Sequence, residues 1–381
     1  MDRDFDLSEE HATTAGDFVR ARSTPRRPPK RAARHAAHKP ASPAVHRSSD
    51  SEPGYRRQRT PEGFDYLNVR GKLIKDARII ARILSIVIPP AWEDVWICTD
   101  PLGHLQATGR DARGRKQYRY HPSWREQRES EKFAKIAQFA RALPRVRAAV
   151  ERDLALEGLP REKVIAAIVR LLDRSLARIG GAEYARDNAT YGLTTLCKRH
   201  VRLDDESAML RFKGKHGIKH EISVDDALVL AVVRECRQLP GRELFACVVD
   251  AESRRIDADD VNDYLQENGG CGITAKDFRT WGASVAALAL LYDLDPPRSD
   301  RAARRTLAQT IRQVALLLRN TPAVCRRSYV HPWVVEAWQT ATLGNKRFRA
   351  SNAPLAPAER AFALLLKTRT ACGAKRTQRI A

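Results

Sequence analysis

The sequence predicts an α+β protein with a small β-rich N-terminal domain and a larger, mainly α-helical domain behind it. Short extended runs with turn residues between them occupy residues 61–125, and apolar residues recur at helical spacing from about Glu126 onward. One β-hairpin interrupts the helical region. We therefore divide the chain into an arm (1–60), a β-rich domain (61–125), an α-rich domain (126–345) and a C-terminal helix with a basic tail (346–381).

Residues 1–60 are predicted to form a disordered basic arm, because they are rich in Arg, Ala, Pro, His and Ser and lack apolar patterning. Between Arg20 and Arg59 there are twelve Lys or Arg and two acids, Asp50 and Glu52. Such a segment can follow a phosphate backbone by charge alone, although it could equally be a solvated tail. Acidic residues within the first ten positions argue against a mitochondrial presequence.

In the β-rich domain, residues 95–99 and 104–108 flank an Asp-Pro-Leu-Gly turn and predict a hairpin. A further extended run covers 116–120. The loop between these strands, 109–115, is rich in glycine and arginine. We therefore expect a small sheet with a cationic rim.

In the α-rich domain, apolar residues between Val164 and Ile179 fall on one face of a helix. The Thr274 and Asp277 spacing predicts a capping box at the start of a helix. A β-hairpin with a basic turn is expected over 209–222, around Lys215. Further helices are expected at 226–237, 257–268, 275–291, 300–319 and about 359–367.

Charge and composition restrict the classes of function. The 381 residues contain 68 Lys and Arg against 46 Asp and Glu, a formal net charge of +22, which indicates a polyanionic partner. No apolar run approaches the roughly 20 residues of a membrane-spanning helix. Seven cysteines without a Cys-x-x-Cys pair argue against a zinc ribbon or a disulfide scaffold, and favour a reducing, cytoplasmic setting.

The sequence contains no P-loop, no His-Glu-x-x-His motif and no clustered Asp and Glu of the kind that hold magnesium, so we expect neither a metal nor another cofactor. Isolated cations remain at the predicted ends of elements: Arg178, Lys215 and Arg279. Two guanidinium groups and an ammonium can stabilise the charge of a phosphodiester transition state without a metal. Each cation, taken alone, has an ordinary alternative role as a helix-end, loop or ion-pair residue.

Tyr329 lies among cations near the C-terminal side. A phenol has a pKa near ~10, so a nucleophilic tyrosine needs nearby positive charge, and Arg326 and Arg327 are the local candidates. A tyrosine at such a position is more often a packing or surface residue.

Several strings, taken together, resemble the compact, poxvirus-like bacterial type IB DNA topoisomerases. The resemblance runs from about Pro61 to Pro332. It rests on Ile-Pro-Pro-Ala-Trp (88–92), Gln-Ala-Thr-Gly-Arg-Asp (106–111), Gly-Arg-Lys-Gln-Tyr (114–118), Arg-Ile-Gly (178–180), Tyr-Gly-Leu-Thr-Thr-Leu (191–196), Lys-Asp-Phe-Arg-Thr-Trp-Gly (276–282) and Asn-Thr-Pro (320–322) with Tyr329.

The resemblance implies an α-rich catalytic domain of the tyrosine recombinase/topoisomerase IB type and assigns roles in it. Tyr329 would attack the scissile phosphate, forming a 3′-phosphotyrosyl bond and expelling the 5′ hydroxyl. Arg178 and Arg279 would hold the non-bridging oxygens, and Lys215 would protonate the leaving oxygen. Asn320, where the viral enzymes have His, would donate an uncharged hydrogen bond. Religation would then need neither ATP nor metal.

The resemblance also implies duplex DNA as the partner, bound by a monomer that closes as a clamp, with no membrane involved. Further DNA contacts would come from Tyr184, Arg110, Arg115, Lys116 and Tyr118. The expected location is the nucleoid in the bacterial cytoplasm.

Two alternatives remain. Tyrosine recombinases share the Arg, Lys, Arg and Tyr set, but carry His-x-x-Arg around the second arginine, where this chain has Lys-Asp-Phe-Arg (276–279). A non-catalytic DNA-coating protein is supported by charge alone.

Overall fold

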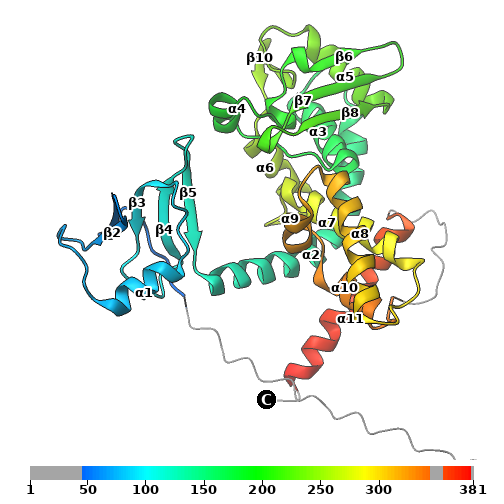
Figure 1. Cartoon of the computed structure of the whole chain (residues 1–381). Helices are drawn as coiled ribbons and strands as arrows, with labels where there is room; N and C mark the ends of the chain where they lie inside the picture. Colours follow the sequence, from blue (N-terminus) through cyan, green and yellow to red (C-terminus); the bar gives the residue numbers. More distant parts are fainter. Residues whose placement is uncertain (1–44, 344–354, 379–381) are drawn as a thin grey trace, which may run out of the picture. The chain divides into compact units, whose positions relative to one another are not determined.

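The computed structural model describes residues 45–343 and 355–378, so most of the predicted arm and the end of the basic tail lie outside the described residues. The described chain combines helices with small antiparallel sheets, which confirms the predicted α+β class (Figure 1). None of its described helices combines the length and the apolar character needed to cross a membrane.

The N-terminal sheet has five antiparallel strands in the order β2-β1-β3-β4-β5. Its elements are β1 (Tyr55–Thr60), β2 (Gly63–Leu67), α1 (Ala77–Ser85), β3 (Glu93–Ile97), β4 (Leu105–Arg110) and β5 (Lys116–Tyr120). Ile83 of α1 is buried with Val95, Ile97 and Ala107 of the sheet, so the helix covers one face of the strands. The predicted hairpin and the strand at 116–120 are confirmed.

Strand β1 lies inside the segment that we assigned to the disordered arm, and that assignment is wrong for residues 55–60. The arginines there are structural as well as cationic. Arg57 donates to the carbonyl oxygen of Pro89 at 3.1 Å, and its guanidinium carbon lies 4.2 Å from the centroid of the Phe64 ring. Helix α1 was not predicted either, because its apolar positions precede a proline-rich turn that reads as a loop.

The α-rich part begins with α2 (Pro122–Leu154), four residues earlier than expected. The helices α3 (Arg161–Ser175), α6 (Ala258–Gly269) and α7 (Ala275–Tyr292) pack with it around the main core. The other helices are α4 (Ala182–Asn188), α5 (Ala227–Gln238), α8 (Asp300–Leu318), α9 (Pro322–Ser328), α10 (Pro332–Gln339) and α11 (Pro357–Gln378). The expected helices near 226–237, 257–268, 275–291 and 300–319 are confirmed.

The capping box at the start of α7 is also confirmed. The backbone N–H of Thr274 donates to the Asp277 carboxylate at 2.9 Å, and the Thr274 hydroxyl donates to it at 3.0 Å. These bonds satisfy groups that the first turn of a helix leaves free, and so fix where α7 begins.

A three-stranded sheet and a second hairpin lie within the helical part. The sheet contains β6 (Val201–Leu203), β7 (Ala208–Lys213) and β8 (Lys219–Val224), and the hairpin contains β9 (Ala246–Val249) and β10 (Glu252–Arg255). Strands β7 and β8 form the predicted hairpin, with Lys213 paired to Lys219, so residues 214–218 form its turn.

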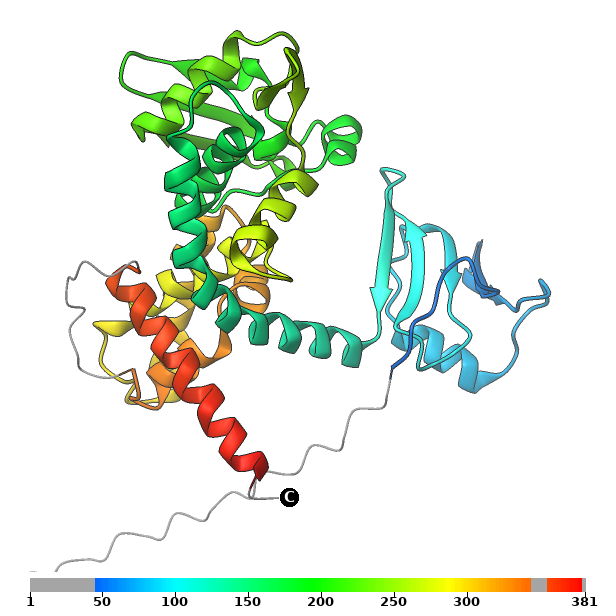
Figure 2. The ribbon, with the colours of Figure 1, turned by 180° about the vertical axis from the view of Figure 1, so that it is seen from behind.

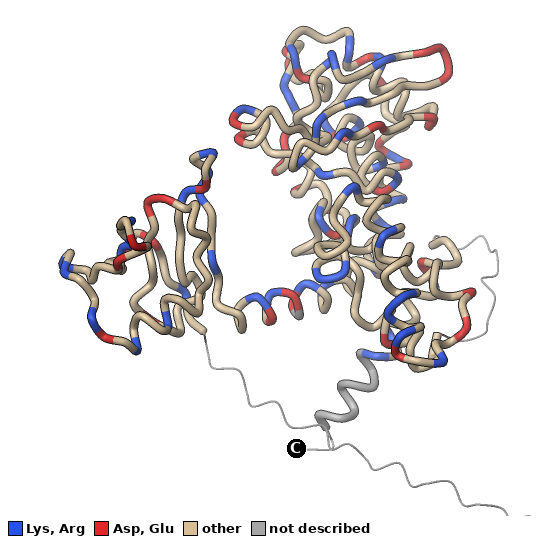
Figure 3. The backbone as a smooth tube through the Cα atoms, viewed as in Figure 1, with Lys and Arg blue, Asp and Glu red and all other residues tan. Residues whose placement is uncertain are grey.

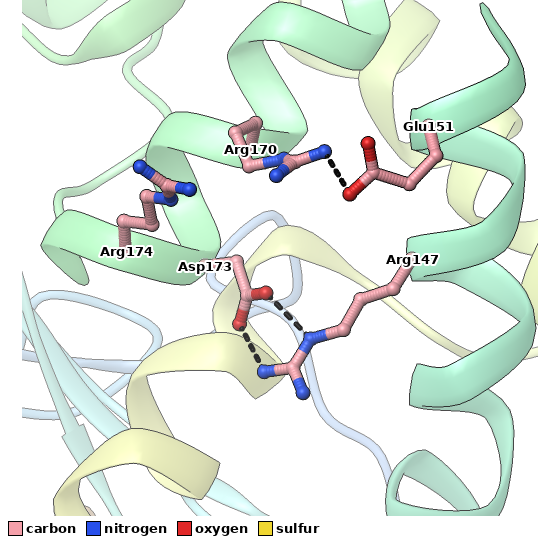
Figure 4. Close-up of a pocket in the computed structure, with 5 residues that line it drawn as sticks. All are labelled: Arg147, Glu151, Arg170, Asp173 and Arg174. Carbon is pink, nitrogen blue, oxygen red and sulfur yellow. Dashed lines mark hydrogen bonds and ion pairs between the residues drawn. The ribbon is translucent and has the colours of Figure 1, made fainter. Parts of the chain in front are cut away.

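A network of ion pairs joins α2, α3 and α11. Arg147 of α2 binds Asp173 of α3 at 2.7 Å (Figure 4), and it also binds Glu359 of α11 at 2.8 Å. Beside it, Arg170 pairs with Glu151 at 2.5 Å. Arg178 lies three residues after the end of α3. The ion-pair network therefore fixes the helix that leads into the candidate site.

Helix α11 starts two residues before the predicted Glu359 and is longer than predicted. It lies against α2, α7 and α10 (Figure 2), with Phe362 and Leu366 fully buried in the main core.

Candidate active site

Tyr329 follows the last residue of α9, and its side chain is half-buried against the main core. Thr321 caps this short helix and Pro322 occupies its first turn, which suits a helix start. Ser284 of α7 fixes the chain at the tyrosine and at the second residue after it. Its hydroxyl oxygen lies 3.1 Å from the carbonyl oxygen of Tyr329 and accepts from the backbone N–H of His331 at 3.0 Å.

Arg279 of α7 is 3% exposed and lies beside this tyrosine. Its guanidinium carbon is 5.2 Å from the centroid of the Tyr329 ring. The two terminal nitrogens donate to the carbonyl oxygens of Leu176, which ends α3, and Leu318, which ends α8, the latter at 3.0 Å. Arg279 therefore joins the ends of two helices, and a buried cation in this position needs an anionic partner.

Arg178 comes from the segment after α3, which pairs with the chain at 192–194. Its carbonyl oxygen accepts from the backbone N–H of Leu193 at 3.0 Å. A Cβ on Gly192 would lie 2.5 Å from that oxygen, so only glycine allows this approach. Burial and the charge of Arg279 lower the pKa of Arg178, while the interaction with the Tyr329 phenol opposes the shift.

Two buried guanidinium nitrogens in this cluster lack a hydrogen-bond partner among the described residues: Nη1 of Arg178 and Nε of Arg279. Buried donors are almost always satisfied, so unsatisfied ones call for an explanation. The structure thus brings three of the sequence-predicted residues together: Arg178, Arg279 and Tyr329.

Arg326 and Arg327 were the expected sources of positive charge near Tyr329. Both side chains are exposed, and Arg327 pairs with Glu129 of α2 at 3.6 Å. The cations that the structure places against the Tyr329 ring are Arg279 and Lys132 instead. Arg326 and Arg327 lie on the exposed side of α9, whereas Arg279 and Lys132 come from α7 and α2.

Lys215 lies in the turn between β7 and β8, as predicted, with its side chain exposed. The next residue, His216, has its pKa lowered by burial and then by the charges of Lys215 and Arg178. In the part of the chain that the structure describes, no hydrogen bond or ion pair joins Lys215 to Arg178, Arg279 or Tyr329.

Asn320 follows α8, two residues after the carbonyl group that Arg279 binds. Its side-chain oxygen accepts from the backbone N–H of Thr321 at 2.9 Å. Because this bond occupies the acceptor of the amide, the NH₂ group is the part available to donate outward.

The weaker DNA-contact candidates are on other elements. Tyr184 lies on α4 and is 60% exposed. In the N-terminal sheet the predicted cations already have acidic neighbours: Arg115 pairs with Asp111 at 2.6 Å, Lys116 with Asp50 at 2.5 Å and Arg110 with Asp94 at 3.6 Å.

Tyr118 is exposed on β5 and stacks with Tyr120 at a centroid distance of 6.1 Å. Because Arg110, Arg115 and Lys116 already pair with carboxylates, any phosphate that binds one of them must compete with a carboxylate. Figure 3 shows Lys and Arg spread over strands, turns and helices, with acidic residues among them.

Three residues of the site were not predicted: Lys132 and Ser284, described above, and Arg319, whose guanidinium donates to the carbonyl oxygens of Glu221 at 2.6 Å and Lys219 at 3.3 Å. Arg319 therefore ties the end of α8 to the strand that follows the Lys215 turn. No local pattern marks these residues, because their partners are distant in the sequence. Among the described residues, no group of three or more His, Cys, Asp and Glu is placed to hold a metal ion.

Comparisons with known proteins identify the family of this chain. Residues 121–351 match the eukaryotic DNA topoisomerase I catalytic core, and residues 63–111 match the bacterial DNA topoisomerase IB N-terminal domain. The DNA topoisomerase 1B of Acanthamoeba polyphaga mimivirus is 31% identical over 294 residues, 75% of this chain and 88% of that protein. The DNA topoisomerase 1B of Vaccinia virus (strain Copenhagen) is 21% identical over 274 residues, 70% of this chain and 81% of that protein. With a family match over more than half of its length, this chain belongs to the type IB DNA topoisomerases.

Proposed function

We propose that Tyr329 is the nucleophile with which this topoisomerase cleaves one strand of supercoiled duplex DNA. The observation that carries the proposal is the position of the Tyr329 ring beside Arg279, at 5.2 Å, with the Arg178 side chain near the same phenol and unsatisfied guanidinium nitrogens on both arginines. A phosphodiester gathers negative charge on its non-bridging oxygens during attack, and these donors can stabilise that charge.

In the proposed reaction the phenol oxygen forms a bond to phosphorus as the phenol proton leaves, and the bond from phosphorus to the 5′ oxygen breaks. Lys215 donates a proton to that oxygen, which is otherwise a strongly basic leaving group. Asn320 donates a hydrogen bond from its NH₂ group to a phosphate oxygen. The phosphotyrosyl ester keeps the bond energy, so the 5′ hydroxyl can reverse the reaction after the strand has rotated.

We also propose that the chain acts as a monomer in which residues 61–125 and 126–345 form the two parts of a clamp around the duplex. The α-rich part then has the architecture of tyrosine recombinases, and the predicted site of action is the bacterial nucleoid. The exposed Tyr118 and the cations Arg110, Arg115 and Lys116 would line the β-rich part, and Tyr184 the α-rich part.

Relaxation of supercoiled plasmid by the full chain, with EDTA present and ATP absent, tests the reaction. We expect full activity, because the proposed chemistry uses only protein side chains. An absolute requirement for magnesium would contradict the proposal. A synapsis assay with two paired DNA sites separates the enzyme from a recombinase, which would join the two sites.

The Tyr329→Phe variant tests the nucleophile. It should bind DNA as the wild type does but form no covalent adduct after quenching with denaturant, whereas Tyr184→Phe should still form one. Mass mapping of the DNA-linked peptide identifies the attacking residue. Unchanged relaxation by Tyr329→Phe would remove this tyrosine from the mechanism and leave a different nucleophile to be found.

The role of Lys215 needs a different substrate. Lys215→Ala should slow cleavage strongly when the leaving atom is a 5′ oxygen, and only slightly when it is a 5′ bridging sulfur, because a thiolate leaves without a proton. Equal slowing of both substrates would exclude Lys215 as the proton donor.

A further inference from the structure

Lys132 of α2 lies against the ring of Tyr329, the proposed nucleophile. In the sequence it precedes every residue to which a catalytic role has been given. Its ammonium nitrogen is 5.1 Å from the centroid of the Tyr329 ring, and 5.0 Å from that of Phe133. The side chain is half-buried. Holding a lysine ammonium partly out of water beside an aromatic ring costs desolvation energy, which is compensated only if the ring or an anion near it interacts with the charge.

Other contacts between α2 and the segment around Tyr329 hold Lys132 in this position. Glu129, one turn earlier, pairs with Arg327 of α9 at 3.6 Å. Phe133, the next residue, makes an edge-to-face contact with His331, with ring centroids 4.9 Å apart. The part of α2 that carries Lys132 is thus fixed against the Tyr329 segment by contacts on two consecutive turns.

The two arginines at the site, Arg178 and Arg279, are proposed to bind the phosphate and not to stabilise the Tyr329 phenolate. Arg178 and Arg279 are proposed to bind the non-bridging oxygens of the phosphate, so their charge is largely balanced once DNA is bound. A phenol is a weak acid, and its ionisation beside a bound phosphodiester anion is disfavoured by like charge. A third cation at the ring would offset this repulsion.

We infer that Lys132 is a further active-site residue, whose positive charge stabilises the Tyr329 phenolate as it attacks the phosphate. The phenol proton leaves to water, the phenolate oxygen bonds to phosphorus and the bond to the 5′ oxygen breaks. Lys132 keeps its own proton throughout, so it acts by charge and not as a base. This inference rests on the proposed role of Tyr329.

The charges around Lys132 set the pH range in which it can act. Burial, followed by the charge of Lys276 on α7, lowers the pKa of Lys132 to about 8, against the opposing effects of Glu129 on α2 and Asp277 on α7. Arg279 of α7 and Arg326 and Arg327 of α9 are further cations on the elements packed here. His331, at the start of α10, has a pKa lowered by burial to about 4, so it stays neutral in this range.

Because the pKa is lowered, Lys132 is charged below about pH 8 and loses its charge above it. About nine-tenths of the molecules carry the charge at pH 7, and about one-tenth at pH 9. An arginine at this position would stay charged throughout. The pH dependence of the ratio between variant and wild-type rates therefore reports the titration of Lys132 alone, because every other titrating group is present in both proteins.

The test compares Lys132→Met, which removes the charge at similar length, with Lys132→Arg and the matched control Lys135→Met. Lys135 is one turn away on the exposed side of α2. Covalent adduct formation is measured with enzyme in excess over supercoiled plasmid, at pH 7 and pH 9. At pH 7 we expect Lys132→Met to be at least about 10-fold slower than the wild type, with Lys132→Arg and Lys135→Met within about 3-fold.

At pH 9 the deficit of Lys132→Met should shrink to about 2-fold, and Lys132→Arg should be the fastest of the four proteins. The inference is overturned if Lys132→Met matches the wild type at pH 7, or if Lys132→Arg is as slow as Lys132→Met. A weaker DNA affinity with an unchanged rate would also overturn it, by making Lys132 a DNA contact. Melting temperatures exclude misfolding, and Tyr329→Phe in the same assay shows separately whether the proposed nucleophile is correct.

Discussion

Arg279 and Tyr329 lie with guanidinium carbon and ring centroid 5.2 Å apart, although 50 positions separate them in the chain. Ser284, on the same helix as Arg279, binds the backbone at Tyr329 and at His331, two residues later. Helix α7 therefore fixes the phenol and the Arg279 guanidinium, a proposed phosphate ligand, relative to each other. Small changes in α7 should consequently affect catalysis more than DNA binding.

Arg279→Lys should lower the rate of adduct formation by about 100-fold or more, because the donors of one ammonium nitrogen cannot span the carbonyl oxygens of Leu176 and Leu318 and a phosphate as the separate nitrogens of a guanidinium can. The rate is measured with enzyme in excess over DNA, alongside the dissociation constant. Arg326→Lys, on the exposed side of α9, is the control and should stay within about 2-fold. Wild-type cleavage by Arg279→Lys would mean that its guanidinium only joins helices.

Gly192→Ala should displace Arg178 and slow cleavage by about 10- to 100-fold, because the new methyl group would meet the Arg178 carbonyl oxygen at 2.5 Å. Gly181→Ala is a matched control on the other side of α4. Its φ is −153°, and its added Cβ would make only an ordinary 3.8 Å contact with Tyr184. Equal rates for the two variants would show that the close approach at Gly192 does not position Arg178.

Arg147→Met should destabilise the protein by about 3–5 kcal/mol, because it leaves the largely buried carboxylates of Asp173 and Glu359 without their cation. The free energy of unfolding in urea measures this loss. Arg186→Ala removes an exposed pair with Asp187 and should change stability by less than about 1 kcal/mol. A similar small effect at Arg147 would show that the network in Figure 4 contributes little to stability.

Stability should fall as the pH is lowered from about 7 to about 4. Burial lowers the pKa of both His220 and His331 to about 4, so between that value and about 6.5 the unfolded chain binds more protons than the folded protein. Each histidine contributes up to about 3 kcal/mol to this loss. Above about pH 7 these two histidines are mostly neutral in both the folded and the unfolded protein. They should therefore contribute almost no pH dependence to the free energy of unfolding there.

His331→Asn tests this assignment. The imidazole Nδ1 accepts from the backbone N–H of Trp333 at 3.1 Å as the cap of α10, and asparagine can take over that cap. The variant should lose about half of the pH dependence that the two histidines contribute. An unchanged slope of stability against pH would place the titration elsewhere.

Sequence patterns determined much of the local structure. Residues 275–291 carry both a helical pattern and the Thr274–Asp277 capping box, and the structure has α7 at Ala275–Tyr292. The hairpin around Lys215 and the strands between Val95 and Tyr120 follow from alternation and turn residues. Such elements depend on contacts between near neighbours, which a sequence displays directly. Strand β1 was missed because its arginines resemble those of the arm, and their partners, Phe64 and Pro89, lie on other elements.

The sequence by itself determined the family resemblance, the surplus of positive charge and the identity of Tyr329, Arg178, Lys215, Arg279 and Asn320 as candidates. Only the tertiary structure decided which of them meet, and it showed that Lys132, and not Arg326, lies against the Tyr329 ring. Contacts of this kind join residues almost 200 positions apart, so they depend on how helices pack. The physical reason is that burial of apolar faces packs α3, α7, α8 and α9 together, so that their ends meet. The charged side chains at these ends are then held close to one another by the hydrophobic core.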